Sequence, residues 1–460
     1  MHSLPDVGAW DTLRHMDRGL REGLRTSPAD PTARRSSPRR ALVSACIGNV
    51  VEWYDFALYG AFATVLARVF FPSGDRHASL LATFAVFSTA FIVRPVGAVL
   101  LGRRGDRRGR RQVLSLAIIL MSVATAGVGA LPGHASIGLL APALLLLFRL
   151  LQGMSAGGEA GAASAFVVEY APANRRGWYG GWIWATLALG LGAGTSAAAL
   201  LAGRLPQDTL ETWGWRLAFL LALPMGLVGL YLRLRLDETP RFRAVQRVRD
   251  VAQWPVSEAL RAYPGRMLTG FVLVAAASLT FNTFFIFLPS QLVAELGVPL
   301  PRALAGALLG LAVMAAVSPA LGRLSDRVGR RPLLVAATLG LLGLTVPVYL
   351  LVRGGGPVGL LLGYLALGAA MGCFVLPSFL SELFPTRVRS SGLAITYGVA
   401  SALFGGTAPL VNALLVQRTG NPLLPAWYAT AVVLAAAIAV LLTGETAFRP
   451  LDADDGRRRP

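Results

Sequence analysis

Long apolar runs separated by short polar segments recur along the whole chain. A run of roughly 20 apolar residues is enough to cross a bilayer, and about twelve runs reach that length. They lie near 42–71, 78–102, 112–132, 138–168, 178–203, 215–236, 267–294, 303–322, 333–352, 357–381, 391–417 and 423–444. This pattern predicts an all-α membrane protein with twelve transmembrane helices.

Composition supports a membrane protein over other classes. Of the 460 residues 54% are hydrophobic and 15% are charged, whereas soluble domains carry about 25% charged residues. The net charge of +19 does not indicate nucleic-acid binding, because the arginines lie between the apolar runs. Cys46 and Cys373 are far apart in apolar surroundings, so we expect no disulfide and no metal site. No enzyme motif is found, and we expect no cofactor.

The polar segments have a charge asymmetry that orients the helices. "GRRGDRRGRR" after the second run carries six arginines and "GRLSDRVGRR" after the eighth carries four. Short arginine-rich loops stay in the cytoplasm, so both termini are expected there, in a multi-pass plasma-membrane protein. Residues 1–40 predict a disordered basic tail, for which contact with anionic lipid is the functional alternative. Residues 447–460 form the second tail.

The two basic loops are copies of each other, so the chain is an internal repeat. We expect two pseudo-symmetric six-helix halves, 41–236 and 267–446, joined by a cytoplasmic linker at 237–266. The acid-containing loops predict a conformational gate, with helix capping as the plainer alternative. The repeated residues are Gly102, Asp106, Arg107, Gly109 and Arg110 in the first copy and Gly322, Asp326, Arg327, Gly329 and Arg330 in the second. "EYAPANRRG" and its echo "ELFPTRVRSSG" add Glu169, Arg176, Glu382 and Arg389.

Both loops match G-x-x-x-D-R-x-G-R-R, and through this motif the chain resembles the major facilitator superfamily. More narrowly, "GNVVEWYDFALYG" and "RLLQGMSAGGEAGAASAFVVEYAP" resemble the metabolite:proton symporter family, over about residues 41–451. Within it, "GLYLRLRLDETP" and "GETAFRPL" resemble the proline/betaine type. The resemblance implies alternating access, a substrate site between the halves and gating by Asp106 and Asp326. The long cytoplasmic coiled-coil tail of the best-known members is absent here, so osmosensing through it is not implied.

Charged residues stand inside the spans of the amino-terminal half, where each costs roughly 2.5–3.5 kcal/mol on insertion scales. Glu52, Asp55 and Tyr59 share one face of the first span, and Arg94 lies within the second. On the fourth span, Arg149, Gln152 and Glu159 form a stripe. The carboxyl-terminal half offers polar groups without charge at its centre. The arginines and acids can serve transport or can pair simply to hold the helices together.

We interpret these residues as the transport machinery. Glu159, Glu52 and Asp55, in that order, are candidates for proton coupling, because a buried carboxylate near an arginine is a plausible proton carrier. The aromatic members can offer a π face to a cation or serve only for packing. The candidate substrate-binding residues are Arg94, Arg149, Glu52, Asp55, Tyr59, Trp53, Gln152 and Asn282.

Three acids facing two arginines within one half favour a zwitterion over a dicarboxylate. We therefore expect a proton-coupled importer of proline, glycine betaine or a similar compatible solute, working as a monomer. A proton symporter of an organic acid, such as a dicarboxylate, citrate or a shikimate-like anion, is the alternative. A drug exporter is disfavoured, because the fifth span, "TLALGLGAGTSAAALL", has no proline. A non-transporting sensor is disfavoured by the lack of a soluble domain.

Overall fold

The structure is a computed structural model that describes residues 38–108, 110–234, 255–354, 356–384 and 389–448. Every regular element in this part of the chain is a helix. Eleven segments of the described residues are long and apolar enough to cross a membrane. The first span, which carries Glu52 and Asp55, completes the predicted twelve, and the all-helical membrane fold is confirmed.

The amino-terminal half contains the first six spans. Their helices are α2 (Pro38–Ala61), α3 (Ala63–Phe70), α4 (Arg76–Ile92), α5 (Arg94–Arg108), α6 (Arg110–Ala130), α7 (His134–Ile137), α8 (Leu140–Tyr170), η1 (Ala173–Arg175), α9 (Arg176–Arg204), α10 (Gln207–Thr209), η2 (Leu210–Gly214), α11 (Trp215–Leu220) and α12 (Ala222–Leu234). The second span is divided at Val93, because Pro95 lacks an N–H and crowds the preceding turn.

The carboxyl-terminal half follows a short helix, α14 (Pro255–Ala262), in the region predicted as the linker. Its helices are α15 (Pro264–Asn282), η3 (Thr283–Phe287), α16 (Leu288–Leu296), α17 (Leu300–Val328), α18 (Arg330–Arg353), α19 (Pro357–Gly372), α20 (Leu376–Leu383), α21 (Arg389–Ala400), η4 (Ser401–Gly406), α22 (Ala408–Thr419) and α23 (Leu424–Leu442). Spans seven and eleven are interrupted by the π-helical segments η3 and η4. Such segments occur frequently at functional sites.

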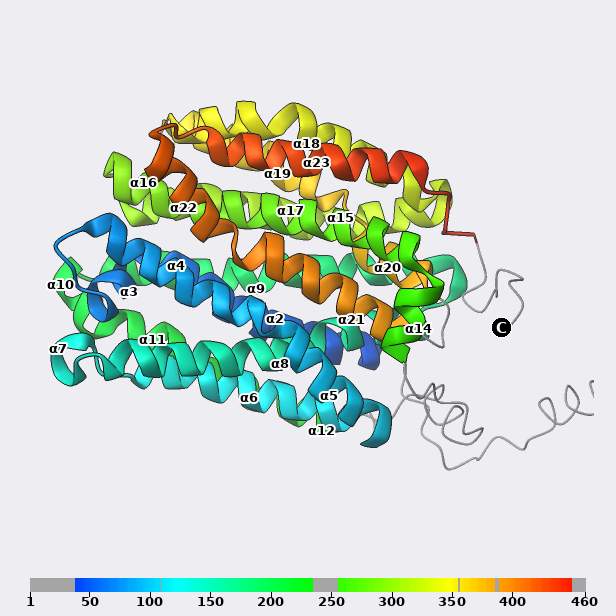
Figure 1. Cartoon of the computed structure of the whole chain (residues 1–460), viewed down its shortest axis with the longest axis horizontal. Coiled ribbons are helices and arrows are strands. Elements are labelled where there is room, and N and C mark those ends of the chain that lie inside the picture. The colour runs from blue at the N-terminus through cyan, green and yellow to red at the C-terminus, as the bar shows by residue number, and fades with distance from the viewer. Residues whose placement is uncertain (1–37, 109, 235–254, 355, 385–388, 449–460) are drawn as a thin grey trace, which may run out of the picture. The chain divides into compact units, whose positions relative to one another are not determined.

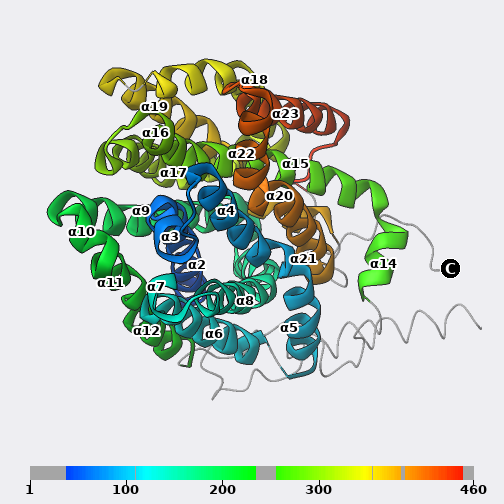
Figure 2. The same ribbon diagram turned by 60° about the vertical axis from the view of Figure 1, so that its left-hand side comes forward.

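The two sets of helices lie on opposite sides of a shared boundary (Figure 1), and the turned view shows the same grouping (Figure 2). α9 and α17 pack along this boundary, while α2 packs on α9. α21 reaches across to α8 and α5. Residues from both halves can therefore meet at α2, α9, α15 and α21.

Glycines permit the closest helix approaches within the amino-terminal half. A Cβ added at Gly153 or Gly157 of α8 would overlap backbone atoms of the second span, at Ala90 and Arg94 respectively. On α9, a Cβ at Gly190 or Gly194 would lie 2.6 Å from a carbonyl oxygen of α2. Small residues at helix interfaces allow this contact in membranes.

Candidate functional site

The two acids of the first span each bind a different arginine. Glu52 and Asp55 are 2% and 0% exposed on α2. Arg94 Nη2, from the start of α5, donates to Glu52 Oε1 at 3.0 Å. Arg149 Nη1, from α8, donates to Asp55 Oδ2 at 2.8 Å. The sequence placed all four residues within the spans, and the structure brings them together as two buried ion pairs.

Asp55 is held more tightly than Glu52. Its Oδ1 accepts from Thr125 Oγ1 at 2.9 Å and from Gln152 Nε2 at 2.6 Å, in addition to the bond from Arg149 to Oδ2. Gln152 Oε1 also accepts from Arg149 Nη1 at 2.8 Å. All of these groups belong to the amino-terminal half. Asp55 therefore accepts three hydrogen bonds from the described residues, whereas Glu52 accepts one.

Aromatic rings surround both guanidinium groups. Arg94 lies 4.2 Å from the ring centroid of Phe91, 4.8 Å from that of Phe56 and 5.8 Å from that of Trp53. Arg149 lies 4.5 Å from the ring of Tyr59 and 5.1 Å from that of Phe56. Such contacts stabilise a cation by about 0.5–2 kcal/mol. In this structure the rings therefore face the protein's own cations.

Arg94 and Arg149 each have two nitrogens that donate no hydrogen bond in the described structure. A guanidinium has five N–H donors. In the described structure, Nε and Nη1 of Arg94 have no hydrogen-bond partner, and neither have Nε and Nη2 of Arg149. Buried donors are normally satisfied, so each arginine can bind a further acceptor. The two spare donors of Arg149 share one edge of the guanidinium, which fits a carboxylate, whereas those of Arg94 lie on different edges and suit two separate acceptor atoms.

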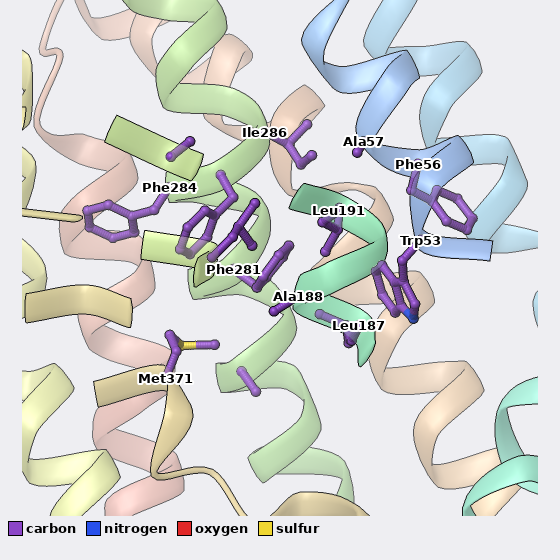
Figure 3. Packing of buried hydrophobic residues seen from close by; sticks show 14 of the residues in the cluster. Trp53, Phe56, Ala57, Leu187, Ala188, Leu191, Phe281, Phe284, Ile286 and Met371 are labelled. Atoms are coloured by element: carbon purple, nitrogen blue, oxygen red, sulfur yellow. The ribbon is translucent and has the colours of Figure 1, made fainter. Parts of the chain in front are cut away.

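Trp53 of α2 lies at the boundary between the halves. Its indole N–H donates to Asn49 Oδ1 at 3.1 Å. Its ring centroid lies 6.3 Å from that of Phe281 on α15, and Phe281 stacks on Phe285 at 4.8 Å. Figure 3 shows Trp53 and Phe281 converging with Leu191 from α2, α15 and α9. Trp53 thus meets the other half, whereas the Asp55 pair has its partners in its own half.

Two other candidate site residues make local contacts. The Tyr59 hydroxyl donates to the carbonyl oxygen of Thr83 at 3.0 Å. Asn282, at the end of α15, donates from Nδ2 to the carbonyl oxygen of Ser278 at 2.8 Å. Neither contact involves the ion pairs on α2.

Glu159 lies buried on α8, but its partner is a residue that the sequence did not single out. Arg233 of α12 donates to Glu159 Oε1 and to the carbonyl oxygen of Leu114 on α6. This pair lies against Gly48 of α2, where an added Cβ would overlap both side chains. Arg233 stands in the alternating run "YLRLRL", which gave no signal that one of its arginines turns inward.

Asp326 of the second gate loop contacts the opposite half. Its Oδ1 accepts from Gly177 N at 2.7 Å and its Oδ2 from Trp178 N at 3.0 Å. These amides belong to the first turn of α9, where the helix dipole favours a negative charge. They follow Arg176, another gate candidate, which forms an ion pair with Glu382 at 4.0 Å.

Arg330 links this contact to the rest of the gate motif. Its Nη1 donates to Asp326 Oδ1 at 2.9 Å, and its Nη2 donates to Glu382 Oε1 at 3.0 Å. Gly329, with φ of 104°, adopts a conformation that side chains disfavour, and Glu445 Oε1 accepts from Arg330 N beside it. Arg327 is exposed at the end of α17.

The structure describes only some of the remaining gate candidates. Arg389 Nε donates to the carbonyl oxygens of Ser381 at 2.8 Å and Phe384 at 3.1 Å. The first copy of the gate motif and the acid that ends the fourth span lie outside what the structure describes in side-chain detail. These residues are Gly102, Asp106, Arg107, Gly109, Arg110 and Glu169. Their expected gating role stays a prediction, as does that of the second copy.

Thr125, Arg233, Tyr397 and Glu445 are site neighbours that sequence reasoning missed as candidates. Thr125 and Arg233 bind the acids of α2 and α8. Tyr397 lies on α21, the helix of the other half that packs against α5, which begins at Arg94. Among the described residues no three His, Cys, Asp or Glu side chains come together as a metal site. The chemistry available is ion pairing, hydrogen bonding and proton exchange.

Comparison with solved structures shows the major facilitator fold. The xylose transporter of E. coli, in a partially occluded inward-open conformation, matches with a TM-score of 0.72 and 20% identity, covering 90% of this chain and 100% of that chain. The same transporter, a proton:xylose symporter bound to a bromodeoxyglucose, matches with the same score over 91% of this chain and 98% of its own.

Relatives found by sequence share a higher percentage of identical residues with this chain. The chain is 38% identical to the glycine betaine/proline/ectoine/pipecolic acid transporter of Dickeya dadantii, over 90% of this chain and 84% of that protein. It is 36% identical to the proline/betaine transporter of Escherichia coli K12, over 90% and 85%. The model of the sugar (and other) transporter family matches residues 41–257 and 247–455. The chain therefore belongs to the sugar (and other) transporter family of the major facilitator superfamily, and is a transporter of the same family as the bacterial proline/betaine transporters.

Proposed function

We propose that the chain imports a zwitterionic compatible solute, such as proline or glycine betaine, together with a proton. The names of its relatives support this substrate class. The observation that carries the proposal is the state of Arg94. It is buried at the boundary of the halves, bound to one carboxylate oxygen, and has two donors to spare.

The proposed binding mode places one oxygen of the substrate carboxylate on the spare Nη1 of Arg94, next to the Nη2 that binds Glu52. A hydrogen bond from a guanidinium to a carboxylate is charge-assisted and therefore stronger than a neutral one. A quaternary ammonium cannot donate a hydrogen bond, so the π faces of Trp53 and Phe281 suit the cationic end. Their rings lie 6.3 Å apart at the boundary of the halves.

Glu52 is the acid that we propose for proton coupling. When a substrate carboxylate binds a spare donor of Arg94, one guanidinium faces two carboxylates and no longer neutralises both. Glu52 then binds a proton, because burial and a second negative charge both disfavour its charged form. The proton and the substrate thus enter together. Asp55 keeps three donors throughout, and Glu159 keeps Arg233, so both rank below Glu52.

We also propose an orientation of the protein in the membrane. We place the arginine-rich loops, both termini and the Asp326 contact on the cytoplasmic side of the plasma membrane, by the positive-inside rule. The solute then enters from the opposite face. A single copy of the chain contains all the residues of the proposed site.

Uptake by reconstituted transporter tests the function. Labelled proline and glycine betaine are offered to proteoliposomes with an imposed pH gradient, acid outside. The proposal expects accumulation that the gradient drives and that excess unlabelled proline or betaine blocks.

An organic acid is the second candidate, and the spare donors of Arg149 favour it. Two arginines with two free nitrogens each could bind two carboxylates. If a di- or tricarboxylate blocks uptake while proline and betaine leave it untouched, the zwitterion proposal is wrong and this candidate replaces it.

A further inference from the structure

The π-helical segment η4 of the carboxyl-terminal half docks on the end of α4, immediately before Arg94 in the chain. Ser88 Oγ, on α4, donates to the carbonyl oxygen of Gly406 in η4 at 2.7 Å. A Cβ added at Gly406 would overlap Cβ and Cγ of Phe91, which is itself 1% exposed. Because Gly406 has no side chain, the backbone of span eleven can lie directly against Phe91.

Phe91 in turn contacts Arg94. The two residues are three positions apart, on either side of the break at Val93 between α4 and α5. The ring centroid of Phe91 lies 4.2 Å from Cζ of Arg94, closer than the rings of Phe56 and Trp53. A guanidinium is attracted to an aromatic face within about 6 Å. A continuous series of contacts therefore runs from η4 of one half, through Phe91, to Arg94 of the other.

Hydrogen bonds fix only one nitrogen of the Arg94 guanidinium. Nη2 donates to Glu52, whereas Nε and Nη1 have no hydrogen-bond partner in the described structure. A long side chain that is held at one atom can still adopt several rotamers. The ring that lies against the guanidinium reduces this choice.

We infer that Phe91 is a positioning residue for Arg94, and that η4 of the opposite half holds Phe91 in place. The inference rests on the proposed function. Phe91 keeps the guanidinium in the orientation that presents Nη1 to the substrate while Nη2 stays on Glu52. Because η4 belongs to the other half, Arg94 is fully positioned only while spans two and eleven are in contact. The affinity for substrate thus depends on the contact between the halves.

Phe84 is a matched control for Phe91. It lies two turns earlier on α4, is 0% exposed, and packs its ring 6.3 Å from that of Phe287 in the opposite half. In the part of the chain that the structure describes, its ring contacts no arginine. Replacing either Phe by Leu removes a buried ring from the same helix, but only Phe91→Leu removes a ring from Arg94.

The first test measures the dissociation constant of labelled proline with the purified transporter. Without the ring, a smaller fraction of molecules holds Arg94 ready to bind, and the apparent affinity falls by that fraction. We expect Phe91→Leu to weaken proline about 2- to 30-fold, the range of a cation–π contact. Phe91→Tyr, which keeps the π face, should recover most of this loss. Phe84→Leu should lower the melting temperature about as much as Phe91→Leu and bind proline as wild type does.

The second test leaves the ring in place and disturbs its support from the other half. Gly406→Ala adds a methyl group where Phe91 lies, so it displaces either the ring or η4. We expect this variant to weaken proline by a factor similar to that of Phe91→Leu. Gly398→Ala, on α21 of the same span, is the control, because nothing lies within 4 Å of an added Cβ there.

Three outcomes overturn the inference. Phe91→Leu can bind proline as tightly as wild type, or Phe84→Leu can weaken proline equally, which indicates general packing. Gly406→Ala with wild-type affinity refutes the role of η4. Binding of neither proline nor glycine betaine by wild type is a different failure, because it refutes the proposed function itself.

Discussion

Gly177 of α9 and Gly322 of α17 pack backbone against backbone across the two halves, each filling the place where a Cβ on the other would stand. Gly181 continues this contact one turn further, with an added Cβ only 2.6 Å from the carbonyl oxygen of Ser318. Gly322 opens the second gate motif, and Asp326 lies one turn after it. The motif's glycine thus provides the close approach, and its acid provides the hydrogen bonds.

Substitution of Gly322 by Ala is expected to hinder closure on this side. The added methyl group meets backbone atoms of Gly177, which cannot rotate away as a flexible side chain would. We expect greater labelling of cysteine probes placed along this boundary, and slower uptake. Gly340→Ala on α18, where nothing lies within 4 Å, is the control and should label as wild type. Equal labelling of the two variants would contradict this account.

Asp326→Asn should weaken the same closure by removing charge. The two N–H groups at the start of α9 and Arg330 all bond to this carboxylate. Hydrogen bonds to charged groups contribute about 1.5–3 kcal/mol, enough for a shift of tenfold or more between conformations. Probe labelling in Asp326→Asn is compared with that in the exposed Asp208→Asn. Unchanged labelling and uptake in Asp326→Asn would rule out a gating role.

The Glu159–Arg233 pair is expected to be structural. Removing one partner of a buried ion pair costs about 3–5 kcal/mol, whereas removing both charges leaves none unpaired. We expect Glu159→Gln and Arg233→Gln each to lower the melting temperature in detergent, and the double variant to recover it. Gradient-driven uptake should recover as well. A folded double variant that cannot accumulate substrate would instead identify Glu159 as the proton carrier.

Glu445 should make stability depend on acid pH. Burial raises the pKa of this carboxyl. Hydrogen bonds from the backbone N–H groups of Ala447, Arg330, Arg331 and Thr446 together lower the pKa by more than burial raises it, so it lies below the ordinary value of 4.5. Its stabilising contribution is therefore complete above pH 4.5 and is lost as the pH falls through the depressed pKa. The melting temperature of Glu445→Gln should lie below that of wild type at neutral pH, with the gap closing below pH 4.5. A gap that stays constant into strong acid would refute this.

Much of this fold could be predicted from the run lengths and the repeated gate motif. The burial of Glu52, Asp55, Arg94 and Arg149 also followed from their place inside apolar runs, since lipid excludes unpaired charge. Their pairing could not be predicted, because either acid could reach either arginine by helix geometry alone. Only the tertiary arrangement of α2, α8 and Arg94 at the start of α5 decides it.

The partner of Glu159 was even harder to predict from the sequence. Helical periodicity placed Glu159 on the stripe of Arg149 and Gln152, and all three are buried there. Its partner lies 74 residues away in sequence, in a run where Arg233 and Arg235 alternate with leucine. The inward position of Arg233 depends on the space left by Gly48, a tertiary contact that no local pattern encodes.

The coupling of substrate binding at Arg94 to protonation of Glu52 is tested most directly by Glu52→Gln. The introduced amide cannot release or bind the proton, but Arg94 remains free for a substrate carboxylate. In proteoliposomes with an acid-outside gradient we expect this variant to exchange internal for external proline while failing to accumulate it. The control is Glu211→Gln in η2, where Glu211 pairs with Arg68, and this variant should accumulate proline as wild type does. Accumulation by Glu52→Gln in step with the imposed pH gradient would contradict the account.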